Sequence, residues 1–240
     1  MSFPERIVPG AAEPGVDAVH LKRYEFARSF CADRRVLDAG CGVGYGAARL
    51  AAGTVSVVGV DVSEEAISYA KAHYGAPNLS FETMDVGALA FADASFDVVC
   101  SFETIEHVDD PDRVLAEFAR VLAEDGMLVV STPQVEQTTR SPANPYHRVE
   151  YSRADFEELL RRHFQAVDLY GQRRLQTRRH RAAQRLDVLG LRRRFAFLRR
   201  GSALLGTAPT AEMTAGDVVI ARDGIERASE IVAVCRKRQS

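Results

Sequence analysis

The chain has 240 residues, 46% of them hydrophobic, and its 31 Lys and Arg nearly balance its 33 Asp and Glu. This length and apolar content suit one α/β domain over residues 1–240 and exclude intrinsic disorder as the main state. No stretch approaches the roughly 18 apolar residues of a membrane span, and the first residues lack the order of a signal peptide. The four cysteines form no CxxC pair, which favours reduced, buried thiols in a cytoplasmic protein.

The net charge of -2 hides a strongly basic segment. Only three of the basic residues are Lys, and eleven Arg fall between Arg173 and Arg200, where Asp187 is the single acid. We therefore expect an Arg-rich helical insertion over residues 172–216, before the last strand. Either its arginines face water on an amphipathic cover, or they contact an anionic small molecule, an RNA end, an acidic carrier domain or a membrane surface.

In chain order, residues 1–31 are expected to form a helical cover, with the periodic helix at Asp17–Cys31. Strands are then predicted wherever apolar residues run continuously, as they do in parallel sheets buried on both faces. Helices between them begin after Ser63 and after Asp110, which are good N-cap residues. The predicted strands of this part are Arg35–Ala39, Val55–Asp61, Leu79–Met84, Phe96–Phe102 and Met127–Ser131.

The remaining elements complete the predicted sheet. Thr132–Glu150 is too long for a simple connection, so we expect a loop with a functional role. A helix over Ser152–Phe164, a strand to Tyr170 and two closing strands at Asp217–Ile220 and Glu230–Cys235 follow, the direction of the closing strands being open. The alternation predicts an α/β fold with a doubly wound, mostly parallel seven-stranded sheet.

The run Val36–Gly46 is the most informative part of the sequence. Glycines directly after a strand allow a tight turn and a close approach to a ligand, beside the N-terminus of the next helix. A dinucleotide fingerprint would need a third glycine where this chain has Tyr45. Asp38 would also repel a pyrophosphate, whereas it suits an ammonium group. A NAD-binding oxidoreductase is therefore disfavoured, and the alternative is that the glycines serve only as a turn.

Two further carboxylates end the next two strands. Asp61 can accept hydrogen bonds from ribose hydroxyls, and Asp85, with Val86 beside it, can accept one from an adenine amino group. An ammonium group, a ribose and an adenine along three successive strand ends describe S-adenosylmethionine. The alternative is that both carboxylates are only solvated strand ends.

The chain resembles the class I S-adenosylmethionine-dependent methyltransferases with domains of types 11, 23 and 25. The resemblance is carried by the glycine run Val36–Gly46, by the two strand-end acids and by the block Phe96–Val108. The likeness covers roughly residues 20–170 and implies a Rossmann-like methyltransferase fold. The segment around Arg23 and Tyr24 resembles one that folds over the cofactor, so either residue could touch its methionine end, or the segment is only a docking helix. The cofactor contacts that we expect are Tyr24, Asp38, Gly40, Cys41, Gly42, Asp61, Val62, Asp85, Val86 and Phe102.

The block after the fourth strand carries Glu103, Glu106 and His107 at i, i+3 and i+4, so a helical turn would place them on one face. Two carboxylates and an imidazole together shift one another's pKa values unless a cation lies between them. With His147, the block resembles the metal site of methyltransferases acting on the terminal ribose 2′-hydroxyl of small RNAs. That likeness implies Glu103, Glu106, His107 and His147 as ligands of Mg²⁺, Mn²⁺, Fe²⁺ or Zn²⁺.

The same block also occurs in ubiquinone-type O-methyltransferases, and the segment around His147 is similar to loops of sugar and natural-product methyltransferases. There His107 alone would act as a general base without a metal. A third interpretation makes both histidines structural.

We therefore expect a methyltransferase acting on a hydroxyl of a sugar or another small molecule with a vicinal diol, with His107 as the catalytic residue. The alternatives are an N-methyltransferase of a small natural-product intermediate, a terminal-ribose RNA 2′-O-methyltransferase, and a binding module without catalysis. A small-molecule or glycosyl acceptor, anionic or carrier-bound, is favoured over nucleic acid because the basic segment has few aromatics for stacking.

Overall fold

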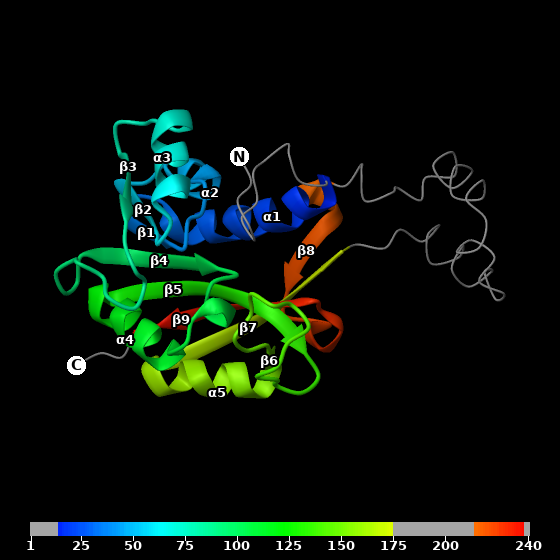
Figure 1. The fold of residues 1–240 in the computed structure, drawn as a ribbon. Helices are drawn as coiled ribbons and strands as arrows, with labels where there is room; N and C mark the ends of the chain where they lie inside the picture. Colours follow the sequence, from blue (N-terminus) through cyan, green and yellow to red (C-terminus); the bar gives the residue numbers. More distant parts are fainter. Residues whose placement is uncertain (1–13, 175–213, 238–240) are drawn as a thin grey trace, which may run out of the picture.

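The computed structural model describes residues 14–174 and 214–237, in which one sheet lies between two layers of helices (Figure 1). Helices α1, α2 and α3 cover one face of the sheet, and α4 and α5 cover the other (Figure 1). Within these two ranges, no helix has the length and apolar character that crossing a bilayer requires. The helices are α1 Pro14–Cys31, α2 Tyr45–Leu50, α3 Glu64–His73, α4 Pro111–Val121 and α5 Arg153–His163.

The sheet has the strand order β3-β2-β1-β4-β5-β9-β7-β8, with β6 paired to β5 off this path. The five strands from β3 to β5 are parallel, whereas β9 joins β5 and β7 antiparallel and β8 joins β7 antiparallel. The α/β prediction with a mostly parallel core is thus confirmed. The strands are β1 Arg35–Ala39, β2 Ser56–Asp61, β3 Leu79–Thr83, β4 Phe96–Phe102, β5 Leu122–Val135, β6 Tyr151–Ser152, β7 Ala166–Arg174, β8 Val218–Ala221 and β9 Glu230–Arg236.

Alternation along each strand builds one hydrophobic core on each face of the sheet. In β1, Val36 packs in the core under α1–α3, whereas Leu37 packs in the core under α4 and α5. Both residues are fully buried, as expected of strands covered on two faces. The helix predicted after Asp110 is α4, and its apolar residues Val114, Leu115, Phe118 and Val121 are all buried against the sheet.

Some predicted boundaries were wrong. The strand expected at Met127–Ser131 is a 14-residue strand, β5, whose end extends four residues into the expected loop. Thr132 and Pro133 pair there with β9, and Gln134 and Val135 pair with β6. The sheet has nine strands where seven were expected. The two-residue strand β6 has no predicted counterpart because it depends on its pairing with β5, whereas β8 lies at the closing strand predicted over Asp217–Ile220.

The Arg-rich insertion falls largely on residues 175–213, outside the described residues. The strands on either side of it form an antiparallel hairpin, in which Arg174 is paired with Val218 and Gly171 with Ala221. The chain therefore leaves the sheet and returns to it at neighbouring positions.

Candidate functional site

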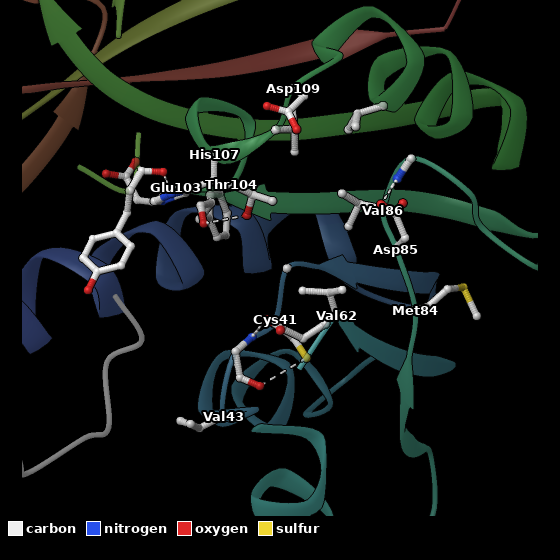
Figure 2. Close-up of a pocket in the computed structure, with 18 of the residues that line it drawn as sticks. Cys41, Val43, Val62, Met84, Asp85, Val86, Glu103, Thr104, His107 and Asp109 are labelled. Carbon is white, nitrogen blue, oxygen red and sulfur yellow. Dashed lines mark hydrogen bonds between the residues drawn. The ribbon is translucent and has the colours of Figure 1, made fainter. Parts of the chain in front are cut away.

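A cavity of about 690 Å³ opens where β1, β2, β3 and β4 end, within the range of sites that bury small ligands (Figure 2). Val62 and Met84 lie across this cavity from Glu103 and His107 (Figure 2). It is the edge of the sheet at which ligands bind in open α/β folds, because the carboxyl ends of parallel strands meet there.

The glycine loop forms the floor of the cavity with a left-handed backbone. Gly40 has a φ of +82°, and a Cβ at this position would collide with the side chain of Thr104. The amide of Gly42 donates to Asp61 Oδ2 over 3.0 Å. The sequence of the loop therefore sets two things, the close approach of β1 to the turn after β4 and the position of the carboxylate at the end of β2.

The predicted ribose and adenine contacts line the cavity. The carboxylate of Asp61 also accepts from the Ser63 amide over 2.9 Å, so both of its oxygens are held by backbone donors. The side chain of Val62 is 69% exposed and lines the cavity, which leaves an apolar surface facing the space beside Asp61. Asp85 Oδ1 accepts from the Gly87 amide over 2.8 Å, and Val86 lies next to it. The other expected contacts that line the cavity are Tyr24, Gly40, Cys41, Gly42 and Phe102.

Asp38 lies beneath the cavity, although we expected it to contact the cofactor. It is 1% exposed and absent from the cavity lining, and the hydroxyl of Tyr24 donates to its two oxygens over 3.3 Å each. Burial raises the pKa of the Asp38 carboxyl to about 7, and the bond from Tyr24 offsets part of that effect. Tyr24, which lines the cavity, therefore lies between the cavity and the Asp38 carboxylate to which it donates.

His107 lies on the 3₁₀ turn Ile105–His107 after β4 and lines the cavity. Its Nδ1 is 3.0 Å from the carbonyl oxygen of Tyr146. Because a carbonyl only accepts, Nδ1 carries a proton, and in the neutral form of the ring the lone pair lies on Nε2. A residue of the long loop after β5 therefore sets the tautomer and orientation of the predicted catalytic histidine.

Ligand atoms of Glu106, His107 and His147 lie within 4.8 Å of one another. Glu106 is fully buried; its Oε2 accepts from the Thr132 hydroxyl over 3.2 Å, whereas its Oε1 has no hydrogen-bond partner among the described residues. Burial and the nearby Glu103 raise the pKa of the Glu106 carboxyl well above its usual value. A divalent cation would supply the missing partner of this oxygen, so the residues fit a metal.

The second histidine of this group is oriented as metal ligands commonly are. His147 donates from Nδ1 to Glu150 Oε1 over 2.8 Å, and a carboxylate on the far nitrogen is frequent behind metal-binding histidines. Its Nε2 accepts from the side-chain amide of Asn144 over 3.0 Å, so a metal that bound to this nitrogen would displace that hydrogen bond. The His107 and His147 rings meet edge to face with 4.8 Å between their centroids.

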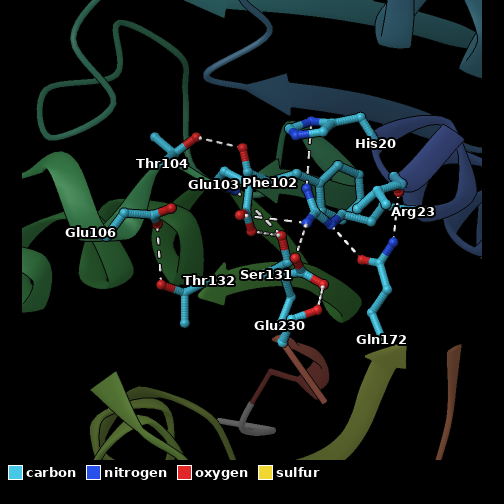
Figure 3. Close-up of polar contacts among 12 residues, drawn as sticks. His20, Arg23, Phe102, Glu103, Thr104, Glu106, Ser131, Thr132, Gln172 and Glu230 are labelled. Atoms are coloured by element: carbon cyan, nitrogen blue, oxygen red, sulfur yellow. Dashed lines mark hydrogen bonds and ion pairs between the residues drawn. The ribbon is translucent and has the colours of Figure 1, made fainter. Parts of the chain in front are cut away.

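The structure does not bring Glu103 to this group, contrary to the predicted single helical face. Glu103 has a φ of +50°, ahead of the 3₁₀ turn, so its side chain leaves in another direction (Figure 3). Its Oε1 accepts from the Ser131 hydroxyl over 2.7 Å, and its Oε2 is 3.4 Å from the guanidinium of Arg23. Glu103 still lines the cavity, but Arg23 does not, so of the two residues expected to touch the cofactor in the N-terminal segment only Tyr24 reaches the cavity.

Tyr146 and Thr132 are among the residues of the site that sequence reasoning missed. Tyr146 contributes the carbonyl that holds His107, and its side chain, 52% exposed, lines the cavity. Its position beside His147 was the available signal. Thr132, which holds Glu106, was placed in a loop because its strand pairing is long-range.

Comparison with known proteins identifies the domain. Residues 37–130 match the family described as a methyltransferase domain. Residues 37–130 form a methyltransferase domain. The matched residues span β1 to β5 and therefore include the glycine loop, the strand-end carboxylates and His107 of this methyltransferase domain.

Individual relatives agree with this assignment. The chain is similar to a protein of Mycolicibacterium smegmatis named a probable S-adenosylmethionine-dependent methyltransferase, with 37% identity over 65% of this chain and 62% of the relative. It is also 38% identical to a ubiquinone biosynthesis O-methyltransferase of Paracidovorax citrulli, over 41% of this chain and 43% of that one. The chain therefore spans less than two thirds of the length of these curated relatives.

The methyltransferase fold is shared with solved structures as well. A methyltransferase of Haloferax volcanii, solved in complex with the Trm112 methyltransferase activator, superposes with a TM-score of 0.63 at 20% identity. The superposition covers 95% of this chain and 93% of the other. At this identity the comparison shows that the two proteins share the fold.

Proposed function

We propose that the protein transfers the methyl group of S-adenosylmethionine to a hydroxyl oxygen of a small molecule, a sugar or another compound with a vicinal diol. The observation that carries the proposal is the setting of His107. Its Nδ1–H is fixed on the Tyr146 carbonyl, so Nε2 is the nitrogen that can take a proton, and the ring lines the same cavity as the glycine loop. A hydroxyl needs such a partner because its pKa lies far above 7.

The residues around the cavity would hold the cofactor along its length. S-adenosylmethionine, when bound, supplies an electrophilic methyl group. Asp61 would accept from the ribose, and Asp85 would accept from the adenine, whose ring would cover the exposed Val62. Tyr24 and Asp38 would meet the amino-acid end. Holding both reactants in one cavity supplies much of the rate enhancement of an in-line displacement.

We further propose that Glu106, His107 and His147 hold a divalent cation. Two imidazoles and one carboxylate suit Mn²⁺, Fe²⁺ or Zn²⁺ better than Mg²⁺, which prefers oxygen ligands, and a bound cation lowers the pKa of a hydroxyl. The neutral His107 ring has one lone pair, on Nε2. Binding a metal and acting as a general base are therefore alternatives for this residue, and removal of metal separates them.

Two observations support methylation of an oxygen atom. One is the position of His107 as a base, and the other is the likeness to a ubiquinone biosynthesis O-methyltransferase. An amine would need only modest help with deprotonation, so methylation of an amine alone would favour the N-methyltransferase alternative. A terminal-ribose RNA is the other alternative.

The test is a methyl-transfer assay with S-adenosylmethionine and a panel of acceptors: a glycoside, a catechol, a primary amine and a short single-stranded RNA. We expect release of S-adenosylhomocysteine with a hydroxylated small molecule. His107→Gln should lower turnover roughly 100-fold or more, with S-adenosylhomocysteine affinity within about twofold of wild type, because a positioned base contributes on this scale. Excess EDTA should abolish turnover, and added Mn²⁺ should restore it.

The matched control is His73→Gln, since His73 lies on α3 and stacks on Tyr69 away from the cavity. Its turnover should equal that of wild type. Wild-type turnover by His107→Gln would refute the role of this residue, and full activity in EDTA would refute the metal.

A further inference from the structure

A buried arginine joins the N-terminal helix to the ends of three strands. Arg23 lies on α1 and is 1% exposed (Figure 3). Its Nε donates to Gln172 Oε1 on β7 over 2.6 Å, and a terminal nitrogen lies 3.4 Å from Glu103 after β4 and 4.0 Å from Glu230 on β9. These partners come from segments that are distant in the sequence and meet at one point under α1.

The partners of Arg23 define where the helix can lie. A buried guanidinium is costly unless its donors are paired, so α1 is held at the position where the fork of Arg23 reaches all of them. Gln172 is fully buried, and its amide donates to the Val19 carbonyl of α1 over 2.6 Å. A lysine would not reproduce this arrangement, because it lacks the planar fork.

The next residue along α1 reaches the cofactor side. Tyr24 lies over Gly46, where any Cβ would collide with its ring. Its ring packs edge to face against Phe102, with centroids 5.0 Å apart, and its hydroxyl donates to Asp38. Tyr24 also lines the cavity. Two adjacent residues of one helix thus connect the strand ends to the cofactor site.

We propose that Arg23 is a positioning residue for the cofactor: by anchoring α1 to Gln172 and Glu103, it places the hydroxyl of Tyr24 on Asp38 and so sets the cofactor affinity. This inference rests on the proposed function in one respect, that S-adenosylmethionine is the cofactor. It differs from a purely stabilising role because it assigns the effect on affinity to Tyr24.

A double-mutant cycle on S-adenosylhomocysteine affinity, measured by calorimetry, tests the proposal. Arg23→Met and Tyr24→Phe should each weaken binding about fivefold or more. The double variant should bind S-adenosylhomocysteine about as weakly as the single variant with the lower affinity, because both changes remove the same contact. Arg23→Lys should recover part of the loss.

Arg23→Met leaves Glu103 and Glu230 without their cation, and it could fail to fold. Gln172→Met keeps the charged residues and removes one partner of Arg23, so it should also weaken binding of S-adenosylhomocysteine. When Tyr24→Phe is already present, adding Gln172→Met should weaken binding no further. Lys22→Ala is the control, since Lys22 lies on the same helix and pairs only at the surface with Glu25. It should bind like wild type.

The outcomes are distinguishable. Absence of S-adenosylhomocysteine binding by wild type would refute the proposed function. Two results would overturn the positioning role while leaving the proposed function standing, provided that the wild-type protein binds S-adenosylhomocysteine. In the first, the fold-losses of affinity of the two single variants multiply in the double variant. In the second, Gln172→Met binds as tightly as wild type.

Discussion

Asp38 is a carboxylate at a place where burial opposes its charge. Burial raises its pKa to about 7, and in the absence of cofactor its charged form is supported mainly by the hydroxyl of Tyr24. If the ammonium group of the cofactor lies above the cavity floor, as proposed, it would favour the ionised carboxylate, and cofactor binding would be coupled to deprotonation of Asp38.

We expect the affinity for S-adenosylhomocysteine to rise between pH 6 and pH 8, with a midpoint near the Asp38 pKa of about 7. Below this pH binding must remove the proton from Asp38, whereas above it the carboxylate is already charged. Calorimetry across this pH range measures the effect. Asp38→Asn should bind more weakly at pH 8 and show a flat profile.

The same variant has a second consequence for stability. The pKa of Asp38 is higher in the folded than in the unfolded chain, so its contribution favours folding at low pH and is lost as pH rises through about 7. Asp38→Asn should therefore raise the stability of the cofactor-free protein at pH 8 more than at pH 5. An unchanged difference between the two pH values would contradict the assigned pKa.

Single residues also show where sequence reasoning ends. The strand-end acids Asp61 and Asp85 were predicted to face the ligand, and they line the cavity because strand ends are local features. Glu103 was predicted to join Glu106 and His107, but its direction depends on Arg23 and Ser131, which come from distant segments. The spacing of residues along a predicted helix contains no information about such distant partners.

At the scale of elements, α4 shows how a predictable face translates into stability. Its N-cap Asp110 accepts from the Arg113 amide over 3.0 Å, and its apolar side packs against the sheet. Phe118, at the centre of that side, is fully buried.

Phe118→Ala should lower the free energy of unfolding by roughly 3–5 kcal/mol, because it removes a large side chain and leaves a cavity in the core. Urea denaturation measures the change. Affinity for S-adenosylhomocysteine in the folded variant should be unchanged, since Phe118 does not line the site. On the exposed side of the same helix, Ala116→Ser should change stability by less than about 0.5 kcal/mol. Equal effects of the two variants would contradict this assignment of faces.

Elements with a strong local pattern were predicted well, and those that depend on pairing were not. The buried strands β1, β2 and β4 and the capped helices α3 and α4 have continuous apolar runs or cap residues in the sequence. The extension of β5 past Ser131 and the short strand β6 have no comparable signal. They exist because β9 and β6 supply partners for the backbone of β5.

For the whole molecule, the paired ends of β7 and β8 make the Arg-rich segment separable from the sheet. Arg174 and Val218 are neighbours across the hairpin, so a short connection can join the two strands. The sequence interpretation gave this segment either a covering role or a role in recognition of an anionic acceptor, and deletion separates the two.

We expect replacement of residues 175–213 by a Gly/Ser linker of about eight residues to leave folding and S-adenosylhomocysteine affinity unchanged. If the arginines recognise the acceptor, the KM for the acceptor found in the panel should rise tenfold or more. Circular dichroism, calorimetry and steady-state kinetics provide the three readouts. An unchanged KM would leave the segment with a covering role, and a lost fold would contradict the hairpin argument.

The hairpin has a consequence for how this protein can diversify. The entropic cost of closing a loop grows only with the logarithm of its length, about 0.6 kcal/mol for each doubling. Insertions of very different length and composition can therefore be exchanged between β7 and β8 while the strands keep their register. If the Arg-rich segment recognises the acceptor, recombination at this junction would change the acceptor range and leave the glycine loop and the strand-end carboxylates intact.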